Sequence, residues 1–233
     1  MGSVSLAAPD HAIPSIAVII PVYNEAYRVG KVLDVVRNVA EIGEIIVVDD
    51  GSNDHSLKVA IQAQECDQRI HLIIHSKNLG KGQAIHSGLN ATRAELILLL
   101  DADLYGLGVQ HLQALYSPLV VDDLDMTIGI FRGGKFYSDF GHWATPWLSG
   151  QRCLWRERLE SISWRAADGY GLETAITMTS LRNKWKWKKV VWRGVSHPPS
   201  ETHRGVVNGL INRSKMYLQI VRAFLLAYRS SSE

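Results

Sequence analysis

Short apolar runs alternate with stretches of helical periodicity through the first hundred residues of the chain. The apolar runs predict four buried strands, at Ile16–Val22, Glu44–Asp49, Arg69–His75 and Glu95–Asp101. The stretches between them predict three helices, from about Glu25 to Ala40, Asp54 to Glu65 and Gly80 to Ala91. This alternation is typical of an α/β fold, in which helices cover both faces of a mostly parallel sheet.

The second half of the chain breaks this rhythm. Its patterns predict strands at Leu124–Phe131 and Trp185–Val195, and helices at Trp155–Ile162, Gly171–Asn183 and Val206–Tyr228. Neither an internal repeat nor a linker separates the halves, so we expect one domain over residues 1–233, with functional halves at 15–105 and 106–233.

Composition narrows the class of protein. A formal net charge of +2 over 233 residues gives no reason to expect a nucleic-acid partner. The two cysteines lack metal-type spacing, which favours reduced thiols in a cytoplasmic protein. No apolar run approaches the ~20 residues of a membrane span, and no secretory signal is expected.

Two carboxylates one residue apart follow the last strand of the first half, in Asp101-Ala102-Asp103. Alternate residues of a strand share a face, so both side chains can approach one point as the strand opens into a loop. Hard oxygen ligands suit Mg²⁺ or Mn²⁺ carrying a diphosphate. Because open α/β sheets bind ligands at the carboxyl ends of their strands, the tripeptide predicts a metal site there.

Three further motifs fall at the same predicted edge: Pro21-Val22-Tyr23-Asn24-Glu25, Asp49-Asp50-Gly51-Ser52 and Gly80-Lys81-Gly82. The last opens a helix, whose N-terminal N–H groups favour phosphate. None of them is a dinucleotide-binding Gly-x-Gly-x-x-Gly loop or a P-loop, which argues against dehydrogenases and kinase-like NTPases.

Together these motifs resemble the GT-A glycosyltransferases of the family-2 type, over about the first 105 residues. The resemblance implies a Rossmann-like sheet and a nucleotide-sugar donor in the half at 15–105, with an acceptor region and a terminal helix after it. It implies a nucleoside site formed by Pro21, Tyr23, Glu25 and Asp50. It also implies that Lys81 meets the diphosphate, and that Asp101-Ala102-Asp103 contacts the metal and the donor.

The second half resembles a narrower group, the glucosyl-3-phosphoglycerate synthases and their mannosyl relatives. Asp168-Gly169-Tyr170-Gly171-Leu172-Glu173 is similar to a Gly-Tyr-Gly-x-Glu segment of that group. A histidine after the last strand completes the metal site there, and His197 falls in the matching place, with His203 as the alternative. Leu148–Arg152 resembles the acceptor loop of the group, but has Ser-Gly-Gln in place of paired glycines, so the resemblance does not by itself fix the acceptor.

The resemblance leaves the stereochemistry open. An inverting enzyme needs a carboxylate base near the acceptor hydroxyl, and Asp168 and Glu173 are the candidates. A retaining enzyme would not need that base, and Glu173 would then orient the substrate. Lys81 would stabilise the charge of the departing nucleoside diphosphate in either case.

Two basic segments carry alternative interpretations. The tryptophans and lysines at 185–192 predict either a half-buried strand or a peripheral contact with a membrane surface. The helix at Val206–Tyr228 predicts packing against its own domain, a partner subunit in a homodimer, or a membrane. Arg132–Lys135 is either a mobile acceptor loop or a plain turn.

The sequence therefore predicts a metal-dependent transferase that moves glucose or mannose from a UDP- or GDP-linked donor. The acceptor is a small phosphorylated acid or a lipid-linked molecule. Two alternatives remain: a sugar-1-phosphate nucleotidyltransferase, which would need an Arg-bearing Gly-rich loop where Tyr23-Asn24-Glu25 stands, and an inert nucleotide-sugar-binding module.

Overall fold

The computed structural model describes residues 14–132, 149–165, 167 and 171–197. The strands are β1 Ile16–Val22, β2 Ile42–Asp49, β3 Ile70–Ile74, β4 Leu96–Leu99, β5 Met126–Arg132, β6 Arg152–Trp155 and β7 Trp187–Arg193. The helices are α1 Val29–Arg37, α2 Ser56–Cys66, α3 Lys81–Asn90, α4 Val109–Val121, α6 Arg156–Glu160 and α8 Leu172–Arg182.

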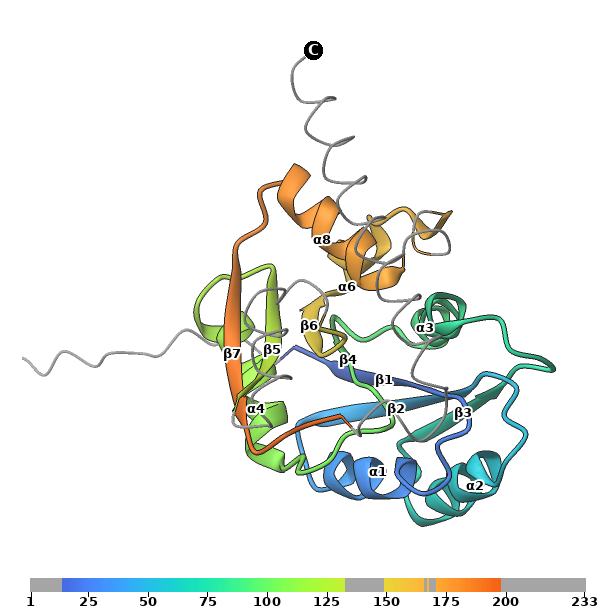
Figure 1. Ribbon diagram of the computed structural model, residues 1–233. Coiled ribbons are helices and arrows are strands. Elements are labelled where there is room, and N and C mark those ends of the chain that lie inside the picture. Colours follow the sequence, from blue (N-terminus) through green and yellow to red (C-terminus); the bar gives the residue numbers. More distant parts are fainter. Residues whose placement is uncertain (1–13, 133–148, 166, 168–170, 198–233) are drawn as a thin grey trace, which may run out of the picture.

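One seven-stranded sheet runs through both halves of the chain, in the order β3-β2-β1-β4-β6-β5-β7 (Figure 1). Pairs β1–β2, β1–β4, β2–β3 and β5–β7 are parallel. Strand β6 is antiparallel to both of its neighbours. The predicted mostly parallel α/β sheet is confirmed, and β6 is the element that joins the two parallel parts.

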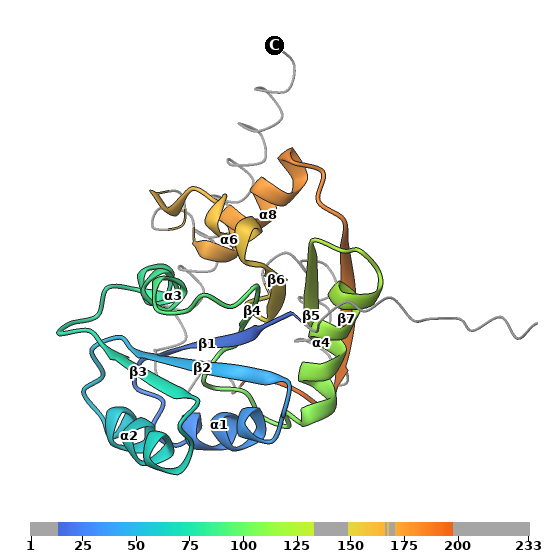
Figure 2. The same ribbon diagram turned by 180° about the vertical axis from the view of Figure 1, so that it is seen from behind.

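Helices form a layer on each face of the sheet. Helices α1, α2 and α4 cover one face, and α3, α6 and α8 cover the other (Figures 1 and 2). The packing of the central strand β1 explains why its sequence is apolar throughout. Val18 and Ile20 pack toward Leu33 of α1, whereas Ile19 packs with Ile85 of α3 in the opposite core. A strand buried on both faces has no polar side to display.

The strands and helices predicted in the first half are all present, with ends shifted by a few residues. The largest shift is in the first helix, which begins at Val29 instead of Glu25. Strand β4 ends at Leu99, so Asp101 and Asp103 lie in the turn beyond it. The two carboxylates are brought together by that turn, and not by the alternation of a strand as predicted.

Two elements of the second half were not predicted. Helix α4 carries Leu112, Leu115 and Leu119 at helical spacing, but Pro118 interrupts the pattern near its end. Strand β6 is only four residues long and includes the fully buried Arg152, which removes the apolar signature of an internal strand. Its position between β4 and β5 is a tertiary feature.

Strand β7 confirms the interpretation of residues 185–192 as a half-buried strand. Trp192 is fully buried in the core, while Lys188 is exposed and pairs with Asp122 at 3.0 Å. Among the helices of the described residues, none combines the length and apolar content that crossing a bilayer requires. The predicted helix at Val206–Tyr228, His203 and most of the Arg132–Lys135 segment lie outside those residues.

Candidate active site

Three predicted metal ligands meet at the carboxyl edge of the sheet. One ligand atom from each of Asp101, Asp103 and His197 lies within 4.8 Å of the others. His197 Nδ1 is 2.9 Å from Asp103 Oδ1, and its Nε2 is 3.7 Å from Asp101 Oδ2. The turn after β4 and the segment after β7 therefore form one cluster, although 94 residues separate the histidine from Asp103.

A short backbone bridge explains how His197 reaches the turn. Tyr105 N donates to Ser196 O at 2.9 Å, and Ser196 N donates to Tyr105 O at 3.1 Å. The imidazole also packs edge-on against Phe131 of β5, with ring centroids 5.0 Å apart. These contacts hold the ring beside the carboxylates.

Lys81, the first residue of α3, lies between two carboxylates. Its Nζ is 2.7 Å from Asp101 Oδ1 and 2.6 Å from Glu173 Oε1. Asp101 belongs to the first half of the chain and Glu173 to the first turn of α8, so this lysine connects the two halves of the chain. Glu173 at a helix start also interacts favourably with the helix dipole.

The charges of the cluster stabilise one another. Burial by itself would lower the pKa of Lys81, but the carboxylates of Asp101 and Glu173 outweigh it and raise that pKa. Burial would raise the pKa of Asp101 and of Glu173, and in both cases the ammonium of Lys81 lowers it instead. For His197, burial is outweighed by the hydrogen bond and charge of Asp103, so its pKa is raised. The acids and the lysine are thus all charged at neutral pH.

The turn after β1 is tied to the loop after β2. Asn24 N donates to Ser52 Oγ at 3.1 Å, and Glu25 N donates to Ser56 Oγ at 2.7 Å. Asn24 adopts a positive φ of 57°, a conformation that asparagine tolerates better than most residues. The turn is therefore fixed by the neighbouring loop, and the carboxylate of Glu25 is paired with Arg28 at 2.6 Å.

Asp50 fastens the loop that leads into α3. Its carboxylate accepts the N–H groups of Leu79 at 2.9 Å and Gly80 at 2.8 Å, and lies 2.7 Å from His75 Nδ1. Asp50 is only 3% exposed, so these hydrogen bonds take the place of those that a solvated carboxylate would make with water. Lys81 follows Gly80 and is the first residue of α3, so the hydrogen bonds of Asp50 also fix where this helix begins.

The residues expected to bind the donor line one cavity of about 260 Å³. Its lining includes every predicted donor-site residue and the histidine of the metal cluster, namely Pro21, Tyr23, Glu25, Asp50, Lys81, Asp101, Ala102, Asp103 and His197. Val22 completes the lining. Four motifs separated along the chain are thus adjacent in space, as the shared sheet edge predicts.

A model of the family described as "Glycosyl transferase family 2" matches residues 17–185, which is more than half of the chain. The chain belongs to glycosyl transferase family 2. The match includes the strand-end motifs and Glu173, and it ends before His197.

Curated relatives of the family align with less than half of the chain. An undecaprenyl-phosphate 4-deoxy-4-formamido-L-arabinose transferase of Photorhabdus laumondii is 37% identical over 97 residues, or 40% of this chain and 30% of that protein. A dolichyl-phosphate beta-glucosyltransferase of Trichomonas vaginalis is 35% identical over 103 residues, or 40% of this chain and 32% of that protein. The alignments thus span about a third of the relatives' length.

Solved structures with a similar fold match nearly the whole chain. Glucosyl-3-phosphoglycerate synthase from Mycobacterium tuberculosis, with Mn²⁺, UDP and glucosyl-3-phosphoglycerate bound, gives a TM-score of 0.69 at 20% identity. The match covers 95% of this chain and 85% of that one. The same synthase with Mn²⁺, UDP and phosphoglyceric acid gives a TM-score of 0.71, and covers 95% and 84%. These matches show that the chain has the fold of that synthase.

The donor set of the cluster fits the divalent metal ion that the family resemblance implies. Two carboxylates and one imidazole offer hard oxygen and nitrogen ligands within one ion's reach. The negative charge of its carboxylates is of the sign that a divalent cation balances. Three protein ligands leave coordination positions for phosphate oxygens and water.

Among the described residues, His75 and Gln151 contact the site although neither was predicted as a donor or metal ligand; Gln151 was expected only as part of the acceptor loop at Leu148–Arg152. His75 is the last residue of the predicted third strand, and it contacts Asp50. Its position at the carboxyl end of that strand could have indicated that it lies near the site. Gln151 contacts Asp101 through its side-chain amide. Glu173 lies beside Lys81, as a role near the substrate requires, whereas Asp168 lies outside the described residues.

Arg152 holds the main chain of Glu173 in place. This fully buried guanidinium donates to Ser149 O at 2.9 Å, Glu173 O at 3.3 Å and Thr177 Oγ1 at 3.1 Å. Burial lowers its pKa to about 10, which still leaves the group charged at neutral pH. Arg152 therefore fastens the first turn of α8 to strand β6.

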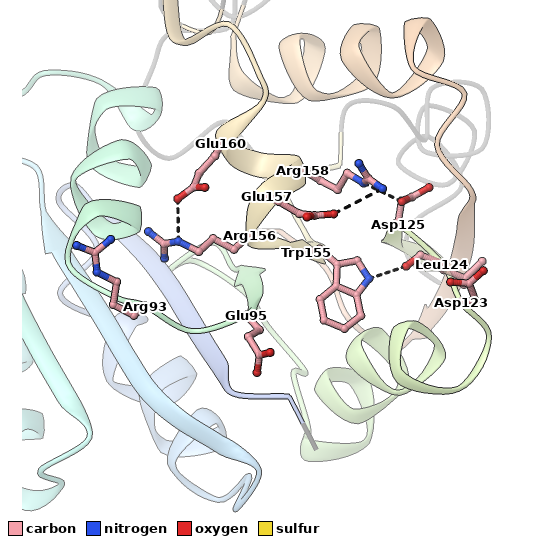
Figure 3. A pocket seen from close by; sticks show the side chains of 10 residues that line it. All are labelled: Arg93, Glu95, Asp123, Leu124, Asp125, Trp155, Arg156, Glu157, Arg158 and Glu160. Carbon is pink, nitrogen blue, oxygen red and sulfur yellow. Dashed lines mark hydrogen bonds and ion pairs between the residues drawn. The ribbon is translucent and has the colours of Figure 1, made fainter. Parts of the chain in front are cut away.

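A larger hollow, of about 470 Å³, lies at the opposite edge of the sheet. Its lining includes Glu95 and Asp125, which directly precede β4 and β5 (Figure 3). Two of its arginines are already paired, Arg156 with Glu160 and Arg158 with Asp125, each at 2.8 Å. The first pair lies within α6 and the second ties α6 to the start of β5, so these charges stabilise the fold and size alone does not make this hollow the functional site.

Proposed function

We propose that this chain transfers a hexose from a nucleoside diphosphate sugar to a phosphate-bearing acceptor, with Mg²⁺ or Mn²⁺. The observation that carries the proposal is the cluster of Asp101, Asp103 and His197 in the same cavity as Lys81 and the Pro21–Glu25 turn. Metal ligands, a cation and a rigid turn are what a nucleoside diphosphate would require of one site.

Asp101, Asp103 and His197 would hold the divalent ion, which when bound supplies positive charge for the diphosphate. The Lys81 ammonium adds a second positive charge, held in place by Asp101 and Glu173 before any substrate arrives. Such preorganised charge stabilises the nucleoside diphosphate as it leaves the sugar. The turn at Pro21–Glu25 and the loop of Asp50 would receive the nucleoside.

The geometry favours an orienting role for Glu173 over that of a base. Its carboxylate is paired with Lys81, which lowers the pKa of Glu173. A general base works best when its pKa lies near the operating pH, and this one moves away from it. Glu173 would therefore hold Lys81 and the substrate in place, as in a retaining enzyme.

The acceptor is a phosphate-bearing molecule, either a small acid or a lipid. The names of the two curated relatives refer to polyprenyl phosphates, and the solved synthase holds phosphoglyceric acid or its glucosyl product. Phosphate is common to both groups of acceptor. The family assignment favours sugar transfer over nucleotidyl transfer, the first of the alternatives from the sequence.

A transfer assay with matched carboxylate variants tests the proposal. UDP-glucose, UDP-galactose, GDP-mannose and GDP-glucose are each offered with Mn²⁺, to 3-phosphoglycerate in one arm and to a polyprenyl phosphate in detergent in the other. One donor should be consumed with an acceptor, and Asp103→Ala should lower kcat by about a hundredfold or more. Asp34→Ala, which removes an exposed carboxylate of α1, should keep full activity.

Equal turnover by wild type and Asp103→Ala would contradict the proposal that this cluster holds the metal ion used in the transfer. Donor binding without any turnover, measured by calorimetry, would instead favour the inert binding module.

A further inference from the structure

Gln151 is a fully buried amide directly before strand β6, and it faces the metal cluster. Its main chain is fixed from both sides, because Gly129 N of β5 donates to Gln151 O at 2.8 Å and Gln151 N donates to Ser149 Oγ at 3.3 Å. The side chain therefore extends from a rigid base in the middle of the sheet.

Both ends of the Gln151 amide are used by one residue. Its Nε2 donates to Asp101 Oδ2 at 2.6 Å, and its Oε1 accepts the N–H of Asp101 at 3.0 Å. Strand β4 has ended at Leu99, paired with Arg152, so the amide continues the ladder where the backbone no longer does. The two bonds fix both the main chain and the carboxylate plane of Asp101.

Gly150 leaves the space that this arrangement needs. A Cβ at this position would lie 2.6 Å from Lys81 Nζ and 2.8 Å from Asp101 Oδ2, closer than real contacts allow. The bare α-carbon lets the backbone of residue 150 pass directly against the Lys81–Asp101 pair. The same two-residue segment thus provides room and a double hydrogen bond for one carboxylate.

We propose that Gln151 is a positioning residue for the metal site, which holds the Asp101 carboxylate in the orientation that a divalent cation requires. The inference rests on the proposed function. Without the amide, a carboxylate in a turn beyond its strand could follow Lys81 and rotate away from Asp103 and His197. Hydrogen-bonding partners of metal ligands contribute about 10–100-fold to metal affinity in other proteins.

The test measures Mn²⁺ alone on the full chain, by electron paramagnetic resonance of the free ion and by calorimetry. Gln151→Met keeps the side-chain volume and removes both hydrogen bonds, and Gln151→Asn keeps the amide but is one methylene shorter. Both should weaken Mn²⁺ binding by about 10–100-fold relative to wild type. Gly150→Ala should weaken it too, by displacing the carboxylate from the other side.

Thr127→Val is the matched structural control. Thr127 is fully buried in β5 and donates to Leu115 O, so its loss lowers stability without touching the cavity. The Thr127→Val variant should have a lower melting temperature than wild type and should bind Mn²⁺ as tightly as wild type does.

Two results would overturn the inference, and they are distinguishable. Folded Gln151 variants that bind Mn²⁺ like wild type would remove the positioning role while leaving the proposed function intact. A wild-type chain that takes up no Mn²⁺, with or without UDP, would overturn the proposed metal-dependent function and the inference with it.

Discussion

Lys81 is a single residue on which both halves of the site depend. It stands between Asp101 and Glu173, and its side chain is still 36% exposed to solvent. Three charged groups so close together stay ionised only because they are arranged with alternating sign. Removing one of them therefore changes the protonation and the position of the others.

Glu173→Gln tests this coupling through the pH dependence of stability. The pKa of Glu173 is lowered in the folded chain, so its contribution is present above its ordinary value of 4.5 and is lost as pH falls through the folded value. The variant should be less stable than wild type by about 1 kcal/mol at pH 7, because Lys81 keeps Asp101 and is partly solvated. The difference should shrink below pH 4.5, as measured by urea unfolding at each pH.

Glu157→Gln provides the comparison, since the side chain of Glu157 is 73% exposed and 3.6 Å from Arg158. Its stability should follow that of wild type at every pH. A Glu173→Gln difference that is constant between pH 7 and pH 3 would show that the carboxylate does not carry the charge assigned to it.

At the scale of elements, the loop after β2 determines where α3 begins. Gly51 in this loop has a φ of +70°, and a Cβ there would lie 2.4 Å from the backbone carbon of Lys77. The loop after β2 thus packs directly on the loop before α3, beside the bonds from Asp50 to Leu79 and Gly80. The contact between these two loops therefore fixes the position of Lys81 relative to Asp50 in the cavity.

Gly51→Ala should therefore destabilise the chain by about 1–3 kcal/mol, because it adds backbone strain and a clash with main-chain atoms. The measurement is the midpoint of urea unfolding. Gly43→Ala, within β2 itself, is the control, since its Cβ would meet the nearest atom at 3.8 Å without a positive φ. Similar midpoints for the two variants would show that the loops are free to separate.

At the scale of the whole molecule, one sheet brings residues from both halves of the chain to a common edge. The site is complete only when β4 and β7 are both in place, because His197 follows the last strand. Ligands that bind only this assembled edge must stabilise the entire fold.

UDP or GDP with Mn²⁺ should accordingly raise the melting temperature by about 5–10 °C at ligand concentrations a hundredfold above Kd. Nucleotide or Mn²⁺ alone should have a smaller effect, and Asp103→Ala should lose the joint effect. Differential scanning fluorimetry with each nucleotide, with and without EDTA, provides the measurement. Equal shifts with and without Mn²⁺ would contradict a shared metal and diphosphate site.

Local patterns by themselves determined the α/β class and the edge at which the site lies. Strand β1 is apolar because both its faces are buried, and Asp50, Lys81 and Asp103 follow elements whose ends must meet in a parallel sheet. These signals are local: periodicity shows the elements, and the direction of the chain shows which ends coincide.

Only the tertiary structure decided which side chains surround the metal cluster and hold it in place. The place of β6 between β4 and β5 is what brings Gln151 to Asp101 and Arg152 to the first turn of α8. A four-residue strand with a buried arginine has no periodic signature, and its partners are far away in sequence. The pairing of Lys81 with Glu173 likewise joins residues 92 apart, because contacts between layers follow from packing rather than from any local pattern.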